Sequence, residues 1–465
     1  MFKSIVNFYK ISEPSEPLQM DERKQQRYYR KLSLQAFVAA TLGYSLYYVC
    51  RTSLNVMKKP ILDNGILDAT QLGYIGSALL IAYAVGKFVN GFIADYCNIK
   101  KFMATGLIIS TAANLIMGIL GLASGVTAVT TSVMFIVFAI MWGVNGWSQS
   151  MGAPPAIISL SRWFPLNRRG TYYGFFSASH NLGEWFSFVF VGQVVALFGW
   201  QWGFFGSAIA GAIGVIIILF FLHDTPESKG LPAIEVLAHE SKEAPAKNES
   251  TQEIQRQVLR SPAVWILAAA SAFMYVSRYS LNSWGVLFLQ EAKGFDMGDA
   301  TFIISINALL GIFGTVLSGW LSDVLFKGNR NIPAFISGVL LTVAYIMFIY
   351  GGDSYIVNVA SMVLFGIAIG VLICFLGGLM AVDIVPRKAT GAALGIVGMA
   401  SYAAAALQEV VSGYLINNNI TETVNELGEV VKHYDFSQAA IFWIGASIIS
   451  FLLPILNWNK KVREE

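Results

Sequence analysis

The stretch Tyr48-Val-Cys-Arg-Thr-Ser-Leu-Asn55 occurs a second time in this sequence, as Tyr275-Val-Ser-Arg-Tyr-Ser-Leu-Asn282. Six of the eight positions match, at an offset of 227 residues, and each copy places one arginine, Arg51 or Arg278, inside an otherwise apolar segment. An arginine at the centre of a membrane helix costs roughly 2.5–3.5 kcal/mol on insertion scales. Two such arginines at matching places therefore indicate one shared anionic partner.

The composition is that of a membrane protein. Of the 465 residues, 55% are hydrophobic and only 13% are charged, against roughly 25% charged in soluble domains. The net charge of +3 is too small and too dispersed to favour nucleic acid as a partner. The three cysteines lie in or beside apolar segments, so we expect no disulfide framework, metal or cofactor. We also expect no removable signal peptide.

Twelve apolar runs approach or exceed the roughly 20 residues that a helix needs to span a bilayer. This pattern predicts an all-α integral membrane protein. The runs cover approximately residues 33–56, 71–94, 102–124, 130–155, 171–198, 201–222, 262–289, 299–322, 332–351, 354–382, 390–416 and 437–457.

The distribution of positive charge predicts that both termini are cytoplasmic. We expect a cytoplasmic N-terminal segment at 1–32, a six-helix bundle at 33–222, a cytoplasmic linker at 223–261, a second six-helix bundle at 262–457 and a cytoplasmic tail at 458–465. The polar insertion at about 417–435 faces the other side and is expected to be a solvated loop. Lys58 and Lys59 face that side too, and acids nearby offset their charge.

The internal repeat extends beyond the arginine stretches. Gly91-Phe-Ile-Ala-Asp95 recurs as Gly319-Trp-Leu-Ser-Asp323, and the stretch from 165 to 170 matches the stretch from 386 to 391. Three landmarks in the same order predict two pseudo-symmetric copies of one six-span unit. Duplicated halves are a common transporter architecture, with the substrate site between the halves near mid-membrane.

Five further motifs carry a family resemblance. They are Gly43-Tyr-Ser-Leu-Tyr-Tyr48, Ala82-Tyr83 with Lys87-Phe88, Ser179-His-Asn-Leu-Gly183, Asp224-Thr-Pro226 and Phe326-Lys-Gly-Asn-Arg330. With the two six-span halves, they resemble the organophosphate:phosphate antiporters of the major facilitator superfamily. The likeness covers nearly the whole chain and is greatest for the branch of hexose-phosphate receptors and glucose 6-phosphate transporters.

The resemblance implies a role for individual residues. The arginines that grip the phosphate in the family correspond to Arg51 and Arg278, and two further phosphate-binding residues correspond to Lys87 and His180. The aromatic lining of the substrate cavity corresponds to Tyr44, Tyr48, Tyr83, Tyr275 and Tyr402. Val371 to Gly378, Leu394 and Val397 depart from the family pattern, which leaves the organic half of the substrate open.

The arginines also have a physical case of their own. A guanidinium meets phosphate oxygens bidentately and stays charged at any physiological pH, so one arginine from each half can hold one dianion. The alternative is that each arginine reaches an interface or pairs with a buried carboxylate such as Glu184 or Glu409.

The other candidates have alternatives as well. Lys87 either binds substrate or pairs with a neighbouring helix, and His180 either contacts phosphate or is a satisfied buried hydrogen-bond donor. Glu184, on the same helical face as His180, is able to orient the imidazole, balance an arginine or carry a proton. Most tyrosines in a membrane protein serve packing and interfaces.

Two aspartates have a separate interpretation. Asp95 and Asp323 lie at cytoplasmic helix ends, and we interpret them as gating residues that latch the halves in one state.

Three functions remain open from the sequence. The first is a monomeric carrier, not an enzyme, that exchanges an organic phosphate such as glucose 6-phosphate for inorganic phosphate in a bacterial inner membrane. The second is a transporter-like receptor for external hexose phosphate that signals to a membrane sensor histidine kinase. The third is a proton-coupled sugar or drug transporter that uses Glu184.

Overall fold

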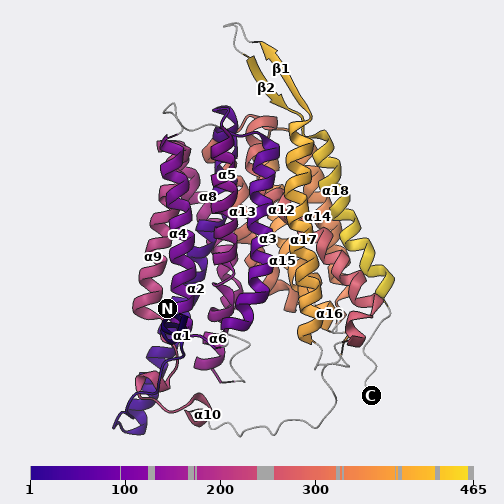
Figure 1. Ribbon diagram of the computed structural model, residues 1–465. Helices are drawn as coiled ribbons and strands as arrows, with labels where there is room; N and C mark the ends of the chain where they lie inside the picture. The colour runs from indigo at the N-terminus through magenta and orange to yellow at the C-terminus, as the bar shows by residue number, and fades with distance from the viewer. Residues whose placement is uncertain are drawn as a thin grey trace.

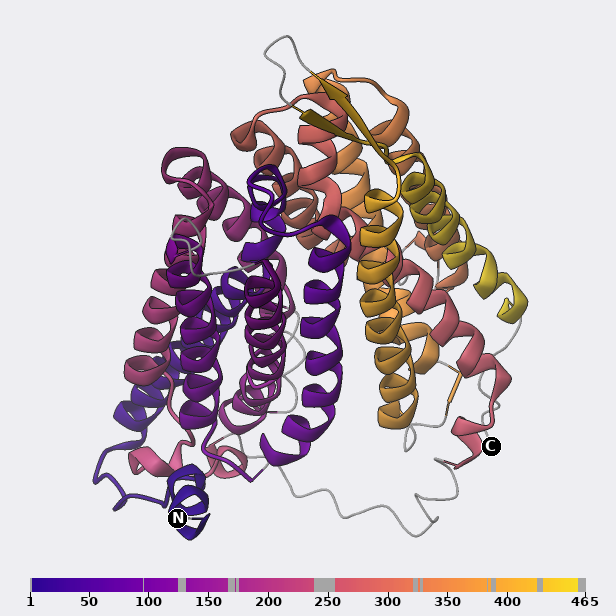
Figure 2. The ribbon, with the colours of Figure 1, turned by 45° about the horizontal axis from the view of Figure 1, so that its top comes forward.

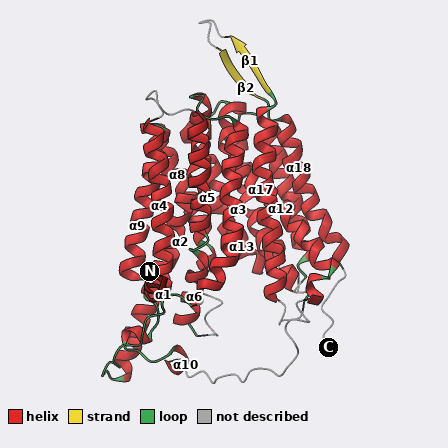
Figure 3. Ribbon diagram, viewed as in Figure 1, coloured by secondary structure: helices red, strands yellow, loops and turns green. Residues whose placement is uncertain are grey.

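A computed structural model describes residues 2–94, 96–123, 131–165, 172, 175–237, 256–320, 325–326, 329–382, 384–385, 390–424 and 430–458. Twelve helices in this part of the chain are long and apolar enough to cross a membrane. Almost everything described is helical (Figure 3). The all-α membrane fold predicted from the twelve apolar runs is therefore confirmed.

The first half contains six of these spans. They are α2 (Glu22–Asp63), α3 (Ala69–Ala94), α4 (Ile99–Ala123), α5 (Thr131–Gln149) continued by α6 (Ala153–Trp163), α8 (Ser179–Phe198) and α9 (Trp200–Phe221). The short helix α1 (Phe2–Tyr9) precedes them, and η1 (Glu227–Lys229) and α10 (Ile234–Leu237) follow them.

The second half contains the other six. They are α12 (Pro262–Lys293), α13 (Met297–Trp320), α14 (Asn331–Tyr350), α15 (Tyr355–Cys374), α17 (Thr390–Asn417) and α18 (Ser437–Leu452). The π-helical turn η3 (Phe375–Leu379) and α16 (Met380–Val382) continue α15, and η5 (Leu453–Asn457) follows α18.

Some elements differ from the sequence expectation for local reasons. Helix α2 begins eleven residues before the expected start of its span, because the Asp21 side chain caps it by accepting a hydrogen bond from the Lys24 N–H at 2.8 Å. The expected fourth span is divided into α5 and α6, and α6 carries a proline in its first two positions.

The polar insertion at 417–435 is not only a loop. Strands β1 (Ile420–Val424) and β2 (Val430–Tyr434) form an antiparallel hairpin in which Ile420 pairs with Tyr434. Both strands are rich in β-branched residues, which favour an extended backbone. The expectation of a solvated loop was wrong for these ten residues, although Glu422 on β1 is exposed.

The two halves lie side by side (Figure 1). Helix α1 lies at one end of the bundle and the β1–β2 hairpin at the other. In Figure 2 the helices of the two halves converge toward the hairpin end and diverge toward the end that carries α1 and α16. Glycines permit the close approach: a Cβ on Gly73 of α3 would overlap the carbonyl oxygen of Glu409 on α17, and a Cβ on Gly413 would meet the Ala69 carbonyl.

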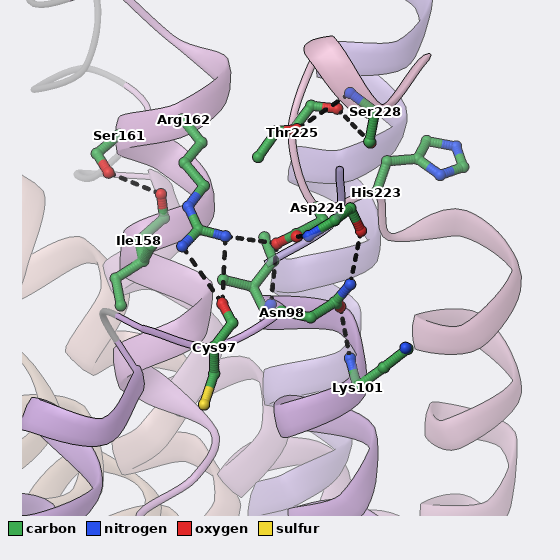
Figure 4. A network of polar contacts seen from close by, with 12 residues as sticks. Cys97, Asn98, Lys101, Ile158, Ser161, Arg162, His223, Asp224, Thr225 and Ser228 are labelled. Carbon is green, nitrogen blue, oxygen red and sulfur yellow. Dashed lines mark hydrogen bonds and ion pairs between the residues drawn. The ribbon is translucent and has the colours of Figure 1, made fainter. Parts of the chain in front are cut away.

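A polar network organised by Asp224 fixes the segment after α9 to the first half (Figure 4). The buried Asp224 carboxylate forms an ion pair with Arg162 and accepts hydrogen bonds from the backbone N–H groups of Ile99 at 3.0 Å and Ser12 at 2.8 Å. Arg162 also donates to the Cys97 carbonyl at 3.3 Å. A buried carboxylate held by several donors is a strong local anchor.

Candidate functional site

The two repeat-related arginines meet between the halves. Arg51 on α2 and Arg278 on α12 are only 5% and 6% exposed, and both line one cavity to which six helices contribute, namely α2, α3, α5, α8, α12 and α17. The cavity is lined by Tyr48, Arg51, Thr52, Asn55, Gly76, Leu79, Leu80, Trp142, Glu184, Arg278, Tyr279, Asn282 and Glu409.

Arg51 has aromatic and hydroxyl partners. Its Nη2 donates to the hydroxyl of Tyr279, on the opposite half, at 2.9 Å. Its guanidinium carbon lies 4.2 Å from the ring centroid of Tyr83 and 5.3 Å from that of Tyr48. Among the described residues no carboxylate forms an ion pair with Arg51. Its positive charge is therefore available to an anion.

Arg278 is paired across the interface. Its Nη2 lies 3.4 Å from Oε2 of Glu184 on α8, and Oε1 of Glu184 accepts a hydrogen bond from Asn282 Nδ2 at 2.8 Å. All three side chains are buried. Of the two carboxylates considered as arginine partners, Glu184 takes this role for one arginine. Glu409 instead pairs with Lys58.

Lys87 and His180 lie beside aromatic rings near the site. The ammonium of Lys87 on α3 lies 5.2 Å from the ring centroid of Tyr402, and the side chain is accessible. Lys87 forms no ion pair with any described residue. The ring of His180 on α8 lies 5.8 Å from that of Tyr48 and is half-buried. Neither residue lines the cavity itself.

The predicted tyrosines gather around the arginines. The Tyr402 ring centroid lies 4.9 Å from that of Tyr83 and 5.4 Å from that of Tyr275, while Tyr44 lies 5.5 Å from Tyr48. Of these five tyrosines, Tyr48 lines the cavity. The other four lie beside residues that line it, namely Tyr48, Arg51 or Tyr279. The proposed gating residues Asp95 and Asp323 lie outside the described residues.

Tyr279 is a cavity residue that the sequence analysis missed. It packs against Tyr275 with ring centroids 5.9 Å apart and holds Arg51 by its hydroxyl. In the first repeat Thr52 stands at the equivalent position. Comparing the two repeats for identical residues overlooks a position where they differ. The place of Tyr279 directly after Arg278 could nevertheless have indicated that it lies near the site.

A second ion pair joins the halves toward the hairpin end. The ammonium of Lys58 lies 3.3 Å from Glu409 Oε2, donates to Ser283 Oγ at 2.6 Å and lies 3.5 Å from the ring centroid of Trp284. Lys59 forms a further ion pair with Glu291 on α12. The sequence analysis treated both lysines as loop cations, but the Lys58 side chain is only 1% exposed.

Comparison with known proteins places this arrangement in a family. The family model described as "Major Facilitator Superfamily" matches residues 40–409. The glycerol-3-phosphate transporter of Bacillus subtilis (strain 168) is 33% identical over 458 residues, covering 96% of this chain and 97% of the relative. The probable hexose phosphate transport protein of Chlamydia pneumoniae is 31% identical over 456 residues, covering 94% and 93%.

A third relative has a different role. The membrane sensor protein UhpC of Salmonella typhimurium (strain LT2) is 31% identical over 405 residues, covering 84% of this chain and 87% of the relative. The motifs favour the hexose-phosphate branch, but glycerol phosphate, hexose phosphate and sensor relatives have similar identities. Overall identity therefore does not separate these functions.

Solved structures share the fold. A bacterial homologue of the human lysosomal transporter Spinster, in an inward-facing and occupied conformation, superposes with a TM-score of 0.67 at 17% identity and covers 92% of this chain and 98% of its own. The nucleoside transporter NupG superposes with a TM-score of 0.63 at 19% identity, covering 92% and 100%. At these identities the likeness concerns the fold alone.

Proposed function

This chain belongs to the major facilitator superfamily, and from that premise we propose that it exchanges an organic phosphate for inorganic phosphate by alternating access. The organic substrate is a hexose 6-phosphate such as glucose 6-phosphate. The carrier works as a monomer in a bacterial inner membrane with both termini in the cytoplasm. Relatives named as transporters of glycerol 3-phosphate and hexose phosphate support the substrate class.

The observation that carries the proposal is the cavity shared by Arg51 and Arg278. One guanidinium comes from each half, and Arg51 has no carboxylate ion-pair partner among the described residues. A phosphate dianion between the two arginines offers bidentate contacts to both. Binding of the anion thereby links the halves at the level of the repeat motif, as a rocking mechanism requires.

The charge of the site suits a dianion. Arg51, Arg278 and the nearby Lys87 are cationic, and Glu184 is anionic. These four side chains together carry a charge of about +2, while the ion pair of Lys58 and Glu409 is neutral as a unit. A phosphate ester, with a charge of about −1.5 to −2 near neutral pH, brings this total close to zero.

This charge also favours obligatory exchange. Of the two arginines, Arg278 has a carboxylate partner, Glu184. Neither Arg51 nor Lys87 forms an ion pair with a carboxylate among the described residues. Closing both ends around an empty site would hold their charges in a cavity of low dielectric, which is costly. Anion-loaded carrier should therefore reorient far more readily than empty carrier.

The ion pairs near the hairpin end would open and close with the transport cycle. Lys58–Glu409 and Lys59–Glu291 both join the first half to the second. The Gly73–Gly413 crossing of α3 and α17 packs the same region. Opening this end would separate these contacts.

The sensor relative favours a second candidate function. A transporter-like receptor would use the same arginines to bind external hexose phosphate and would pass a conformational change to a sensor histidine kinase. The 31% identity to a membrane sensor protein is the observation that favours it. Such a receptor binds substrate without sustained exchange.

The test is exchange by purified protein in liposomes loaded with phosphate. We expect uptake of labelled phosphate and glucose 6-phosphate, and its loss in Arg51→Lys and Arg278→Lys, because lysine keeps the charge but not the fork. Glu422→Gln, at an exposed position on β1, is the control and should exchange normally. Specific hexose phosphate binding without any exchange would overturn the carrier and favour the receptor.

A further inference from the structure

The cavity presents a cluster of oxygen acceptors next to Arg278. Glu184 lies between Arg278 and Asn282, and all three line the cavity. The Asn282 side-chain oxygen is buried and has no hydrogen-bond partner among the described residues. A buried acceptor without a donor is costly, so a group that donates a hydrogen bond would be stabilised there.

The repeat supplies a second amide to the same cavity. Asn55 and Asn282 each follow their arginine by four residues and therefore lie on the same helical face as it. Both line the cavity, but they are used differently. The Asn55 oxygen accepts a hydrogen bond from Ser283 Oγ at 3.3 Å, whereas no described residue donates a hydrogen bond to the Asn282 oxygen. The free acceptor thus lies on the side of Arg278 and Glu184.

Glu184 also limits the charge that the site accepts. Its negative charge neutralises one of the three positive charges carried by Arg51, Arg278 and the nearby Lys87. A carboxylate on the organic half of a substrate would face the Glu184 carboxylate and the Asn282 oxygen. Like charges and two opposed acceptors repel in a buried site.

We propose that Glu184 and Asn282 form a hydroxyl-selective subsite beside Arg278, which admits phosphate esters of neutral polyols and rejects phosphate esters that carry a second anionic group. The phosphate lies between the arginines, and a substrate hydroxyl donates to Asn282 Oδ1. The inference rests on the proposed phosphate-binding role of the arginines. The subsite distinguishes glycerol or hexose phosphates from phosphoglycerates, because only the phosphoglycerates carry a carboxylate besides the phosphate.

The test is ligand binding to the purified full-length protein, measured by calorimetry near pH 8, where phosphate esters are dianions. In the wild type, glycerol 3-phosphate should bind at least about tenfold more tightly than 3-phosphoglycerate. Glu184→Gln should reduce this ratio at least about tenfold, because it removes the repelling carboxylate. Glu184→Asp keeps the charge and should keep the ratio, and Glu422→Gln is the distant control.

A second comparison tests the hydroxyl contact. Glycerol 3-phosphate should bind more tightly than propyl phosphate, which has the same phosphate and no hydroxyl. Asn282→Ala should reduce that preference about threefold to tenfold, as expected for one hydrogen bond. A merely structural role for Asn282 would weaken both ligands equally and leave the preference unchanged.

The outcomes separate this inference from the transport function. Selective binding without exchange in liposomes would support the subsite and overturn the carrier. Exchange with a selectivity that Glu184→Gln does not change would overturn the subsite alone. Wild-type protein that binds 3-phosphoglycerate as tightly as glycerol 3-phosphate would also overturn it, whether or not the variants fold. Absence of all phosphate ester binding would overturn both proposals.

Discussion

Lys58 on α2 and Glu409 on α17 form a buried ion pair, 3.3 Å between Nζ and Oε2, that joins residues 351 positions apart in the sequence. The two side chains are 1% and 3% exposed. The free-energy cost of burying these two charges is offset by their mutual attraction and by the hydrogen bond that Lys58 donates to Ser283. The pair thus connects the two halves near the cavity that contains the arginines.

Removing one partner of this pair should be strongly destabilising. Glu409→Gln leaves Lys58 buried without its counter-ion, at a cost of about 3–5 kcal/mol. We expect a clearly lower unfolding temperature, measured by tryptophan fluorescence in detergent. The double variant Lys58→Met, Glu409→Gln should recover part of the loss because no unpaired charge remains.

The exposed pair of Lys10 and Glu13, 3.2 Å apart, supplies the control. Glu13→Gln should change the unfolding temperature little, since exposed ion pairs contribute at most about 1 kcal/mol. An unchanged unfolding temperature in Glu409→Gln would show that the buried pair does not stabilise this conformation.

Tyr279 should position Arg51 for phosphate. Tyr279→Phe removes the hydroxyl that accepts from Arg51 at 2.9 Å but keeps the ring packed against Tyr275. Hydrogen bonds to charged groups contribute roughly 1.5–3 kcal/mol, so phosphate affinity should fall about tenfold or more. Calorimetric titration of phosphate measures it. Tyr9→Phe, which removes a hydroxyl that donates to Thr105 away from the cavity, is the control, and equal losses in both variants would refute a specific role for Tyr279.

Lys87 should contribute charge to phosphate binding. Lys87→Gln should lower the affinity for phosphate about tenfold, because the site loses one of its positive charges. Lys87→Arg should retain most of the affinity. The affinity of the glutamine variant should also depend less on salt concentration. If the glutamine variant binds phosphate like the wild type, Lys87 lies outside the electrostatic reach of the site.

His223, two residues beyond the end of α9, should make stability depend on pH. Partial burial, together with the nearby cations Lys229 and Lys100, lowers the pKa of His223 to about 4, whereas an unfolded histidine has a pKa of about 6.5. The unfolded chain therefore binds more protons between these values. This contribution to stability is complete above about pH 6.5 and is lost as the pH falls toward 4.

The variant His223→Gln tests that sign. It should have nearly the wild-type unfolding temperature at pH 7.5 and a smaller decrease between pH 6.5 and 4.5. A decrease as steep as that of the wild type would show that other groups cause the acid sensitivity.

The sequence predicted the twelve-helix fold and the meeting of Arg51 and Arg278 for different physical reasons. The positions of the spans depend on local hydropathy, which follows directly from the amino-acid sequence. The repeat implied that equivalent helices approach each other across the pseudo-symmetry axis, and the structure places both arginines on one cavity. The resemblance to phosphate antiporters predicts that the ligand is a phosphate, and this stays a prediction.

The pairing of individual charges could not be predicted in the same way. Lys58 and Glu409 are adjacent because each side chain faces the other half from its own helix, which hydropathy does not specify. Tyr279 stands where the first repeat has Thr52, so a comparison of the two copies for identical residues did not identify it. The sequence left three roles open for Glu184, because its pairing with Arg278 depends on how α8 packs against the second half.

The dependence of phosphate uptake on internal phosphate tests the central claim most directly. Proteoliposomes would be prepared with and without internal phosphate, and the initial uptake of labelled external phosphate compared at equal internal and external pH. We predict uptake at least about tenfold faster with internal phosphate, and no such stimulation in Arg51→Lys. Equal uptake from liposomes without internal phosphate would contradict obligatory exchange through the two-arginine site.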